Sequence, residues 1–131
     1  KNTEVIRKSR IEIEAMRMMV LKAAKAMDVL GNREARVWVS AVKAMVPIRV
    51  CEIIDEAIQI HGATGVSQWT PLANMYASQR TLRLADGPDE VHWFVVGRAE
   101  LSRWVEDGAS EYNPKEDYLE SVELGKAFTG P

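Results

Sequence analysis

Residues 59–92 read QIHGATGVSQWTPLANMYASQRTLRLADGPDEVH and contain two glycine-bearing breaks in an otherwise helical pattern. The first break, residues 62–70, has two glycines, small polar residues and no sustained apolar period, which is typical of a loop. Thr70-Pro71 then favours a new helix, with Thr70 as its cap and Pro71 at its first position. The second break, Asp86-Gly87-Pro88, predicts a turn followed by the start of another helix.

Two longer helical patterns precede this segment. Apolar residues recur in steps of three, four and seven over residues 3–30 and again over residues 33–61. Gly31-Asn32 separates the two patterns, because both residues tolerate a left-handed backbone. Pro47 removes a backbone hydrogen bond from the second pattern, so we expect a kink or a break near Val46. With no strand-like alternation, the prediction is an all-α, antiparallel four-helix bundle over residues 1–106.

The remaining residues, 107–131, are more polar and are expected to form a tail with one short helix from Asn113-Pro114 to about Leu124. The long helices carry more apolar surface than one core stripe requires. We therefore expect a second apolar face to pack against another domain or subunit.

Composition excludes several classes of protein. A formal net charge of -2 argues against non-specific nucleic-acid binding. No run approaches the ~20 apolar residues of a membrane span, and no signal peptide is recognised. The expected location is intracellular. The single cysteine, Cys51, lies in an apolar helical run that favours a buried, inert thiol. Glu or Asp three positions before a His occurs once, at Asp89 and His92, whereas a di-iron bundle needs more ligands, so no metal site is expected.

Taken together, residues 59–92 resemble the C-terminal helical domain of the acyl-CoA dehydrogenases. The family pattern is Gln-Ile-x-Gly-Gly-x-Gly, then Pro-Leu or Pro-Val, then a helix. In one subgroup the pattern continues with Ala-Asp-Gly-Pro-Asp-Glu-Val-His. In this wording the chain resembles the subgroup of acyl-CoA dehydrogenase family members ten and eleven. The spacing from Gln59 to Asp86 matches without a gap, and the resemblance covers about residues 6–101.

This resemblance implies FAD-dependent α,β-dehydrogenation of an acyl-CoA thioester, in fatty-acid β-oxidation or related acyl-CoA catabolism. Asp86 stands where familiar members carry a catalytic Glu, so it is implied as the base that removes the α-proton while the β-hydrogen leaves as hydride to FAD N5. The implied cofactor-binding residues, some of them facing the FAD of a neighbouring subunit, are Gln59, Gly62, Ala63, Gly87, Pro88 and Glu90.

The family also implies partners and further domains. Electron-transfer flavoprotein is the implied electron acceptor, and a homodimer or homotetramer is the implied assembly. The implied location is the bacterial cytoplasm, or the mitochondrion or peroxisome of a eukaryote. Because the family's flavin pocket includes an N-terminal helical domain and a central β-domain, we expect this chain to be part of a longer one and inactive alone.

Three departures from the family pattern bear on the implied site. Asp86 is one methylene shorter than Glu, Pro88 replaces a Thr that usually helps to hold FAD, and Ala63 replaces the second Gly. From the residues alone, Asp86 reads more simply as a helix-boundary residue, since Asp-Gly-Pro is good turn chemistry. Two other functions stay open: a non-catalytic helical interaction or oligomerisation bundle, and a flavin monooxygenase of the same architecture, which needs no α-proton base.

Overall fold

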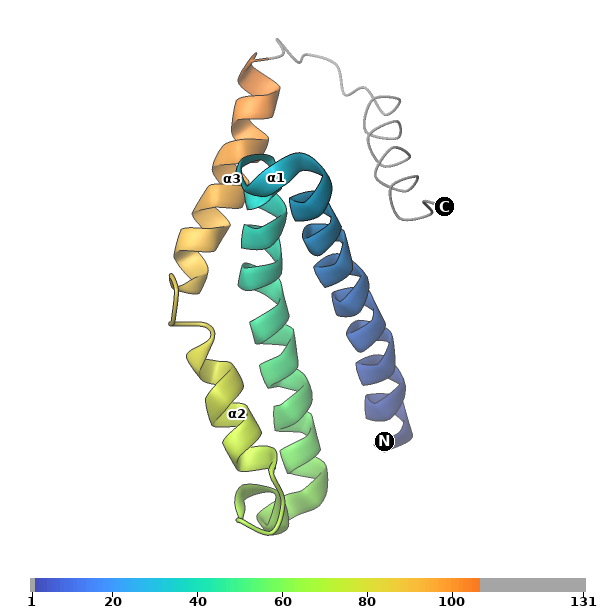
Figure 1. Cartoon of the computed structure of the whole chain (residues 1–131). Coiled ribbons are helices and arrows are strands. Elements are labelled where there is room, and N and C mark those ends of the chain that lie inside the picture. The colour runs from blue at the N-terminus through green and yellow to red at the C-terminus, as the bar shows by residue number, and fades with distance from the viewer. Residues whose placement is uncertain (1, 107–131) are drawn as a thin grey trace.

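The computed structural model describes residues 2–106, and every regular element in this range is helical (Figure 1). The elements are α1 (Asn2–His61), the 3-10 helix η1 (Gly62–Val66), α2 (Leu72–Thr81) and α3 (Asp89–Glu106). The predicted all-α class is confirmed. The tail predicted for residues 107–131, with its short helix, lies outside the described residues.

The long helix α1 is folded back on itself at Gly31. This glycine has φ 81° and ψ 169°, a backbone conformation that residues other than glycine rarely adopt. Figure 1 shows residues 2–30, the first arm, lying beside residues 32–61, the second arm, and running in the opposite direction. The helix end predicted at Gly31 is therefore confirmed.

A kink or a break was predicted near Val46, and the break is wrong. Pro47 lies inside the second arm, and Gly31 is the one residue of α1 with non-helical backbone angles. A proline in a helix removes one backbone hydrogen bond. Here the ring is buried, and the apolar surface that it removes from water offsets part of that cost.

The predicted count of four antiparallel helices is not exact. Within residues 2–106, α2 and α3 each pack on α1, and neither packs on the other. Figure 1 shows them one after the other along the same side of the second arm. The reason lies after α2, where the N–H groups of residues 82–85 still bond to carbonyls three or four positions earlier. Helical winding therefore continues past Thr81, and the chain turns at Asp86 without reversing.

The core lies along α1 and consists largely of small residues. Its buried apolar members are Met16, Ala23, Ala26, Ala35, Ala44, Cys51 and Ile54. Near the fold-back, the ammonium of Lys22 on the first arm lies 3.7 Å from the centre of the Trp38 ring on the second arm, a cation–π contact. Such a core lets the two arms approach closely, because the distance between helix axes follows the size of the side chains between them.

Large apolar side chains remain exposed on every helix. Ile11, Leu101 and Val105 are each more than two thirds exposed, and Trp69 is 90% exposed. Within residues 2–106, no helix carries an apolar stretch of the length that crosses a bilayer. The exposed surface agrees with the expectation of a second apolar face on these helices.

Candidate functional site

The turn between α2 and α3 has a left-handed backbone at two successive residues. Asp86 has φ 55° and Gly87 has φ 97°. Aspartate tolerates a left-handed backbone better than most residues do. At Gly87 there is also little room for a side chain. A Cβ built on Gly87 would lie 3.0 Å from Nε2 of His92. The Asp-Gly pair in the sequence is thus explained by the backbone that it must adopt.

A lysine of the second arm holds this turn against α1. The Lys43 ammonium donates hydrogen bonds to the carbonyl oxygens of Leu82 and Gly87, and 3.1 Å separates Nζ from the Gly87 oxygen. These two carbonyls lie on either side of Asp86. A cation at the C-terminal end of α2 also complements the negative end of the helix dipole.

His92, at the start of α3, connects the turn to the second arm through its two ring nitrogens. Its Nε2 lies 3.2 Å from the Asp86 carbonyl oxygen, and its Nδ1 lies 3.4 Å from the Ser40 hydroxyl. Because a carbonyl can only accept, Nε2 carries the proton, and Nδ1 of a neutral ring then accepts from Ser40. Ser40 itself is buried.

An ion pair also spans the turn. Nε of Arg83 donates to Oδ2 of Asp89 over 2.7 Å, and Asp89 is only 8% exposed. This hydrogen bond raises the pKa of Arg83 above its ordinary value. The other Asp89 oxygen, Oδ1, is buried without a partner among the described residues. The start of α3 predicted after Pro88 is confirmed, with Asp89 and Glu90 in its first turn.

The Asp86 side chain itself is exposed. None of the hydrogen bonds in residues 2–106 involves its carboxylate, so Lys43, His92 and the Arg83–Asp89 pair hold the backbone around Asp86 and not the carboxylate itself. Leu84, two residues earlier, is 62% exposed. Any apolar cover over Asp86 must therefore come from outside residues 2–106.

The predicted cofactor-binding residues fall into two groups: Gly87, Pro88 and Glu90 adjoin Asp86, whereas the other three lie at the far end of α2. Gln59, Gly62 and Ala63 are all exposed where α1 passes into η1. Gly62 has φ 58°, and a Cβ there would meet nothing within 4 Å. Figure 1 shows this loop and the Asp86 turn at opposite ends of α2. A helix of 10 residues is about 15 Å long, so one chain does not bring the two groups together.

The η1 loop is held closely to the second arm by Gly65. A Cβ on Gly65 would lie 2.6 Å from the Ile58 carbonyl oxygen and 2.9 Å from its Cα. Thr70 was predicted to cap α2, but that prediction is wrong. The cap position is Pro71, and the Thr70 hydroxyl instead reaches the carbonyls of Thr64 and Gly65 at 3.3 and 3.4 Å. Thr70 thereby ties the entry of α2 to η1.

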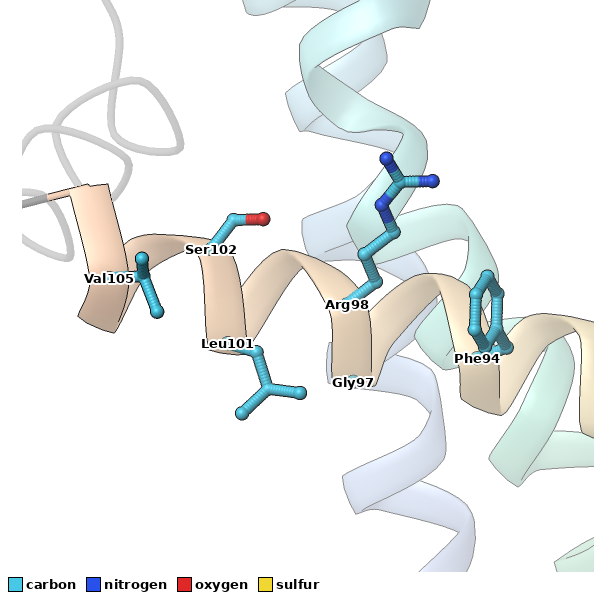
Figure 2. A pocket seen from close by; sticks show the side chains of 6 residues that line it. All are labelled: Phe94, Gly97, Arg98, Leu101, Ser102 and Val105. Atoms are coloured by element: carbon cyan, nitrogen blue, oxygen red, sulfur yellow. The ribbon is translucent and has the colours of Figure 1, made fainter.

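A shallow apolar groove on α3 contains none of the predicted site residues. Its lining comes from this one helix: Phe94, Gly97, Arg98, Leu101, Ser102 and Val105 (Figure 2). Figure 2 shows no second element opposite Leu101 to close it. Among residues 2–106, no group of three or more His, Cys, Asp or Glu residues is placed to hold a metal ion.

Cys51 lies in the second arm and is buried, and burial raises the pKa of its thiol. The thiolate is the reactive form, so we expect iodoacetamide to modify Cys51 about tenfold or more slowly in the folded protein than in denaturant at the same pH. Mass spectrometry of the peptide that contains Cys51 measures both rates. Equal rates in the two states would contradict a buried, inert thiol.

Comparison with known proteins identifies the family. Residues 3–101 match the model for the acyl-CoA dehydrogenase C-terminal domain. The chain belongs to the acyl-CoA dehydrogenase family.

Relatives within the acyl-CoA dehydrogenase family show how much of it this chain covers. Acyl-CoA dehydrogenase family member 11 from Rattus norvegicus is 56% identical over 96 residues, which are 73% of this chain and 12% of that protein. Family member 10 from Mus musculus is 49% identical over 96 residues, or 73% of this chain and 9% of that protein. The solved "Structure of a putative acyl-CoA dehydrogenase from Mycobacterium abscessus" matches with a TM-score of 0.77 and 47% identity, over 79% of this chain and 25% of that one. The chain thus spans a quarter or less of the length of these relatives.

Sequence analysis did not indicate that Lys43 and Ser40 help to hold the turn at Asp86. Both lie in the second arm, 39 to 52 positions from the atoms that they contact. A lysine and a serine on a helix have no motif of their own. The one available signal is that they are three positions apart, which places them on the same helix face.

Proposed function

We propose that this chain is the C-terminal domain of an FAD-dependent acyl-CoA dehydrogenase, in which Asp86 removes the α-proton of an acyl-CoA thioester. The observation that carries the proposal is the Asp86 turn. It presents an exposed carboxylate on a backbone held by three contacts, at the position where familiar members of the family carry their base. A helix boundary alone does not require a backbone held in this way.

The residues at the other end of α2 fit the proposed cofactor. Gln59 offers an exposed amide, and the open space over Gly62 allows a phosphate or ribityl group to approach the backbone. Ala63 is exposed beside them and leaves this approach open. Bound here, FAD would supply the acceptor for the β-hydride. Gly87, Pro88 and Glu90 would border the cofactor at the Asp86 end.

Each protein group in the proposed reaction has a defined task. A carboxylate oxygen of Asp86 accepts the α-proton. The N–H of Ala85 is the last one in the chain before Asp86 that bonds to the Thr81 carbonyl. We propose that the next N–H, that of Asp86, donates to the thioester carbonyl. Negative charge that develops on that oxygen is then stabilised by a fixed donor. General-base and oxyanion contributions would thus come from one residue.

The separation of the two groups along α2 favours a site built by two copies of the chain. Gln59 and Gly62 of one copy would face the flavin whose substrate meets Asp86 of another copy. The exposed apolar residues on α1 and α3 provide surface for such a homodimer or homotetramer. Electron-transfer flavoprotein is the proposed acceptor of the electrons.

Anaerobic mixing of acyl-CoA with the intact, FAD-loaded protein tests the function directly. We expect the visible absorbance of the flavin to bleach, because dehydrogenation transfers two electrons to the cofactor. A series of straight and branched acyl-CoAs identifies the substrate class in the same assay, and an acyl-CoA blocked at the α-carbon serves as the control.

Two outcomes of this assay contradict the proposal. Bleaching by the α-blocked compound would show that no α-proton is removed. Bound FAD that no acyl-CoA reduces would favour the monooxygenase of the same architecture. That enzyme is recognised instead by an oxygenated product that forms from an added substrate when its reduced flavin meets O₂.

A further inference from the structure

One lysine side chain bonds to the backbone on both sides of the proposed base. Lys43 donates to the carbonyl of Leu82, near the end of α2, and to that of Gly87, directly after Asp86. The two acceptors lie 39 and 44 positions from Lys43 in sequence. The turn is therefore fixed to α1, the longest helix of the fold, as well as to its own neighbours.

Ser40 extends this contact along the same face of the second arm. It lies three positions before Lys43 and meets Nδ1 of His92, whose Nε2 donates to the Asp86 carbonyl. Lys43 differs from Ser40 in acting directly and in using two donors at once. Its half-buried ammonium also makes each of these bonds charge-assisted, and such bonds are about twice as strong as neutral ones.

We propose that Lys43 is a positioning residue, which sets the direction of the Asp86 carboxylate by clamping the carbonyls of Leu82 and Gly87. The inference rests on the proposed role of Asp86 as base. The carboxylate forms no hydrogen bond within residues 2–106, so within this range the backbone of the turn is what limits the directions that it can take. A misplacement of about 1 Å at a reacting group can cost about 10²-fold in rate, and loss of the clamp leaves a left-handed Asp86 free to relax.

The test uses Lys43→Met in the intact, FAD-loaded protein, because methionine keeps an unbranched side chain and removes all three donors. We expect the flavin reduction rate at saturating acyl-CoA to fall about 10- to 10²-fold, while the dissociation constant for acyl-CoA changes less than about threefold. Lys43→Arg keeps the charge and several donors and should restore most of the rate. Lys8→Met is the matched control, since Lys8 lies on the first arm in an exposed pair with Glu4.

Hydrogen exchange separates positioning from simple stabilisation, and it needs no substrate. In Lys43→Met, amide exchange should rise in peptides that cover residues 82–88, where the N–H groups of Leu84 and Ala85 bond to Thr81. Exchange in the first arm should stay unchanged. If Lys43→Met does not fold, Lys43→Gln, which keeps one donor group, replaces it in both measurements.

The outcomes divide cleanly. Faster exchange in residues 82–88 together with slower flavin reduction, both reversed by Lys43→Arg, supports the proposal. A folded Lys43→Met protein that reduces its flavin at the normal rate overturns it, even where its stability is lower. The Asp86→Asn variant is measured in the same assay. Full-rate flavin reduction in Asp86→Asn would refute the proposed function. In that case, amide exchange in residues 82–88 of Lys43→Met still decides whether Lys43 holds the turn.

Discussion

Replacing Asp86 by Asn is expected to slow flavin reduction by acyl-CoA about 10²- to 10⁴-fold, the usual contribution of a general base. Asparagine has nearly the same size and tolerates the left-handed backbone as well as aspartate does. The turn at φ 55° should therefore survive, and the loss should come from the missing proton acceptor. Stopped-flow absorbance of the intact, FAD-loaded protein measures the rate.

The control for this variant is Asp28→Asn, which removes an exposed carboxylate from the first arm, away from the Asp86 turn. It should reduce flavin at the normal rate. Thermal unfolding of both variants should stay close to that of the unmodified protein. An Asp86→Asn protein that bleaches its flavin at full speed would remove Asp86 from the mechanism and restore its reading as a helix-boundary residue.

Replacing Gly65 by Ala is expected to have the largest effect on stability among single-methyl changes in the described chain. The added Cβ would lie 2.6 Å from the Ile58 carbonyl oxygen and 2.9 Å from its Cα, and neither backbone atom can rotate away. Overpacking of this kind costs about 1–3 kcal/mol, occasionally more. Urea unfolding of the intact protein measures the loss.

The same substitution should also weaken FAD binding, because η1 would have to move away from the second arm and take Gly62 and Ala63 with it. Gly97→Ala is the matched control. A Cβ on Gly97 meets nothing within 4 Å, and in a helix interior Ala is favoured over Gly by about 0.5–1 kcal/mol. If Gly65→Ala were as stable as Gly97→Ala, the close packing of η1 on Ile58 would be contradicted.

The sequence predicts this fold well wherever a local signal is strong. Gly31 ends a periodic apolar pattern, and the structure reverses there with φ 81°. Pro88 precedes two acidic residues, and α3 begins at Asp89. Pro47 misled the prediction of a break, because its local cost is real but burial of the ring inside a long helix offsets part of it. The direction of α3 relative to α2 was also not predictable, since it depends on how residues 82–85 continue to wind.

The candidate site was predictable to a similar extent. The spacing from Gln59 to Asp86 located both groups of residues, and the helix predicted between them already set them apart along the chain. The spacing could not reveal the contacts of Lys43, Ser40 and the Arg83–Asp89 pair, because these contacts join residues by position in space. Periodicity identifies helix faces, whereas the choice of which polar side chain meets which carbonyl is made by tertiary packing.

The buried alanines of α1 reverse the usual expectation about which core substitutions are most destabilising. Ala26, Ala35 and Ala44 are fully buried, so truncation has almost no side-chain volume to remove there. Enlarging substitutions are the harmful ones, because each added methyl group must push α1 away from the segment that packs against it. In a library of random variants, depletion at these alanines should therefore rise with residue size, whereas a leucine-rich core is most sensitive to shrinkage. The close approach of α1 to its neighbours, more than the amount of apolar surface, is what the sequence must preserve.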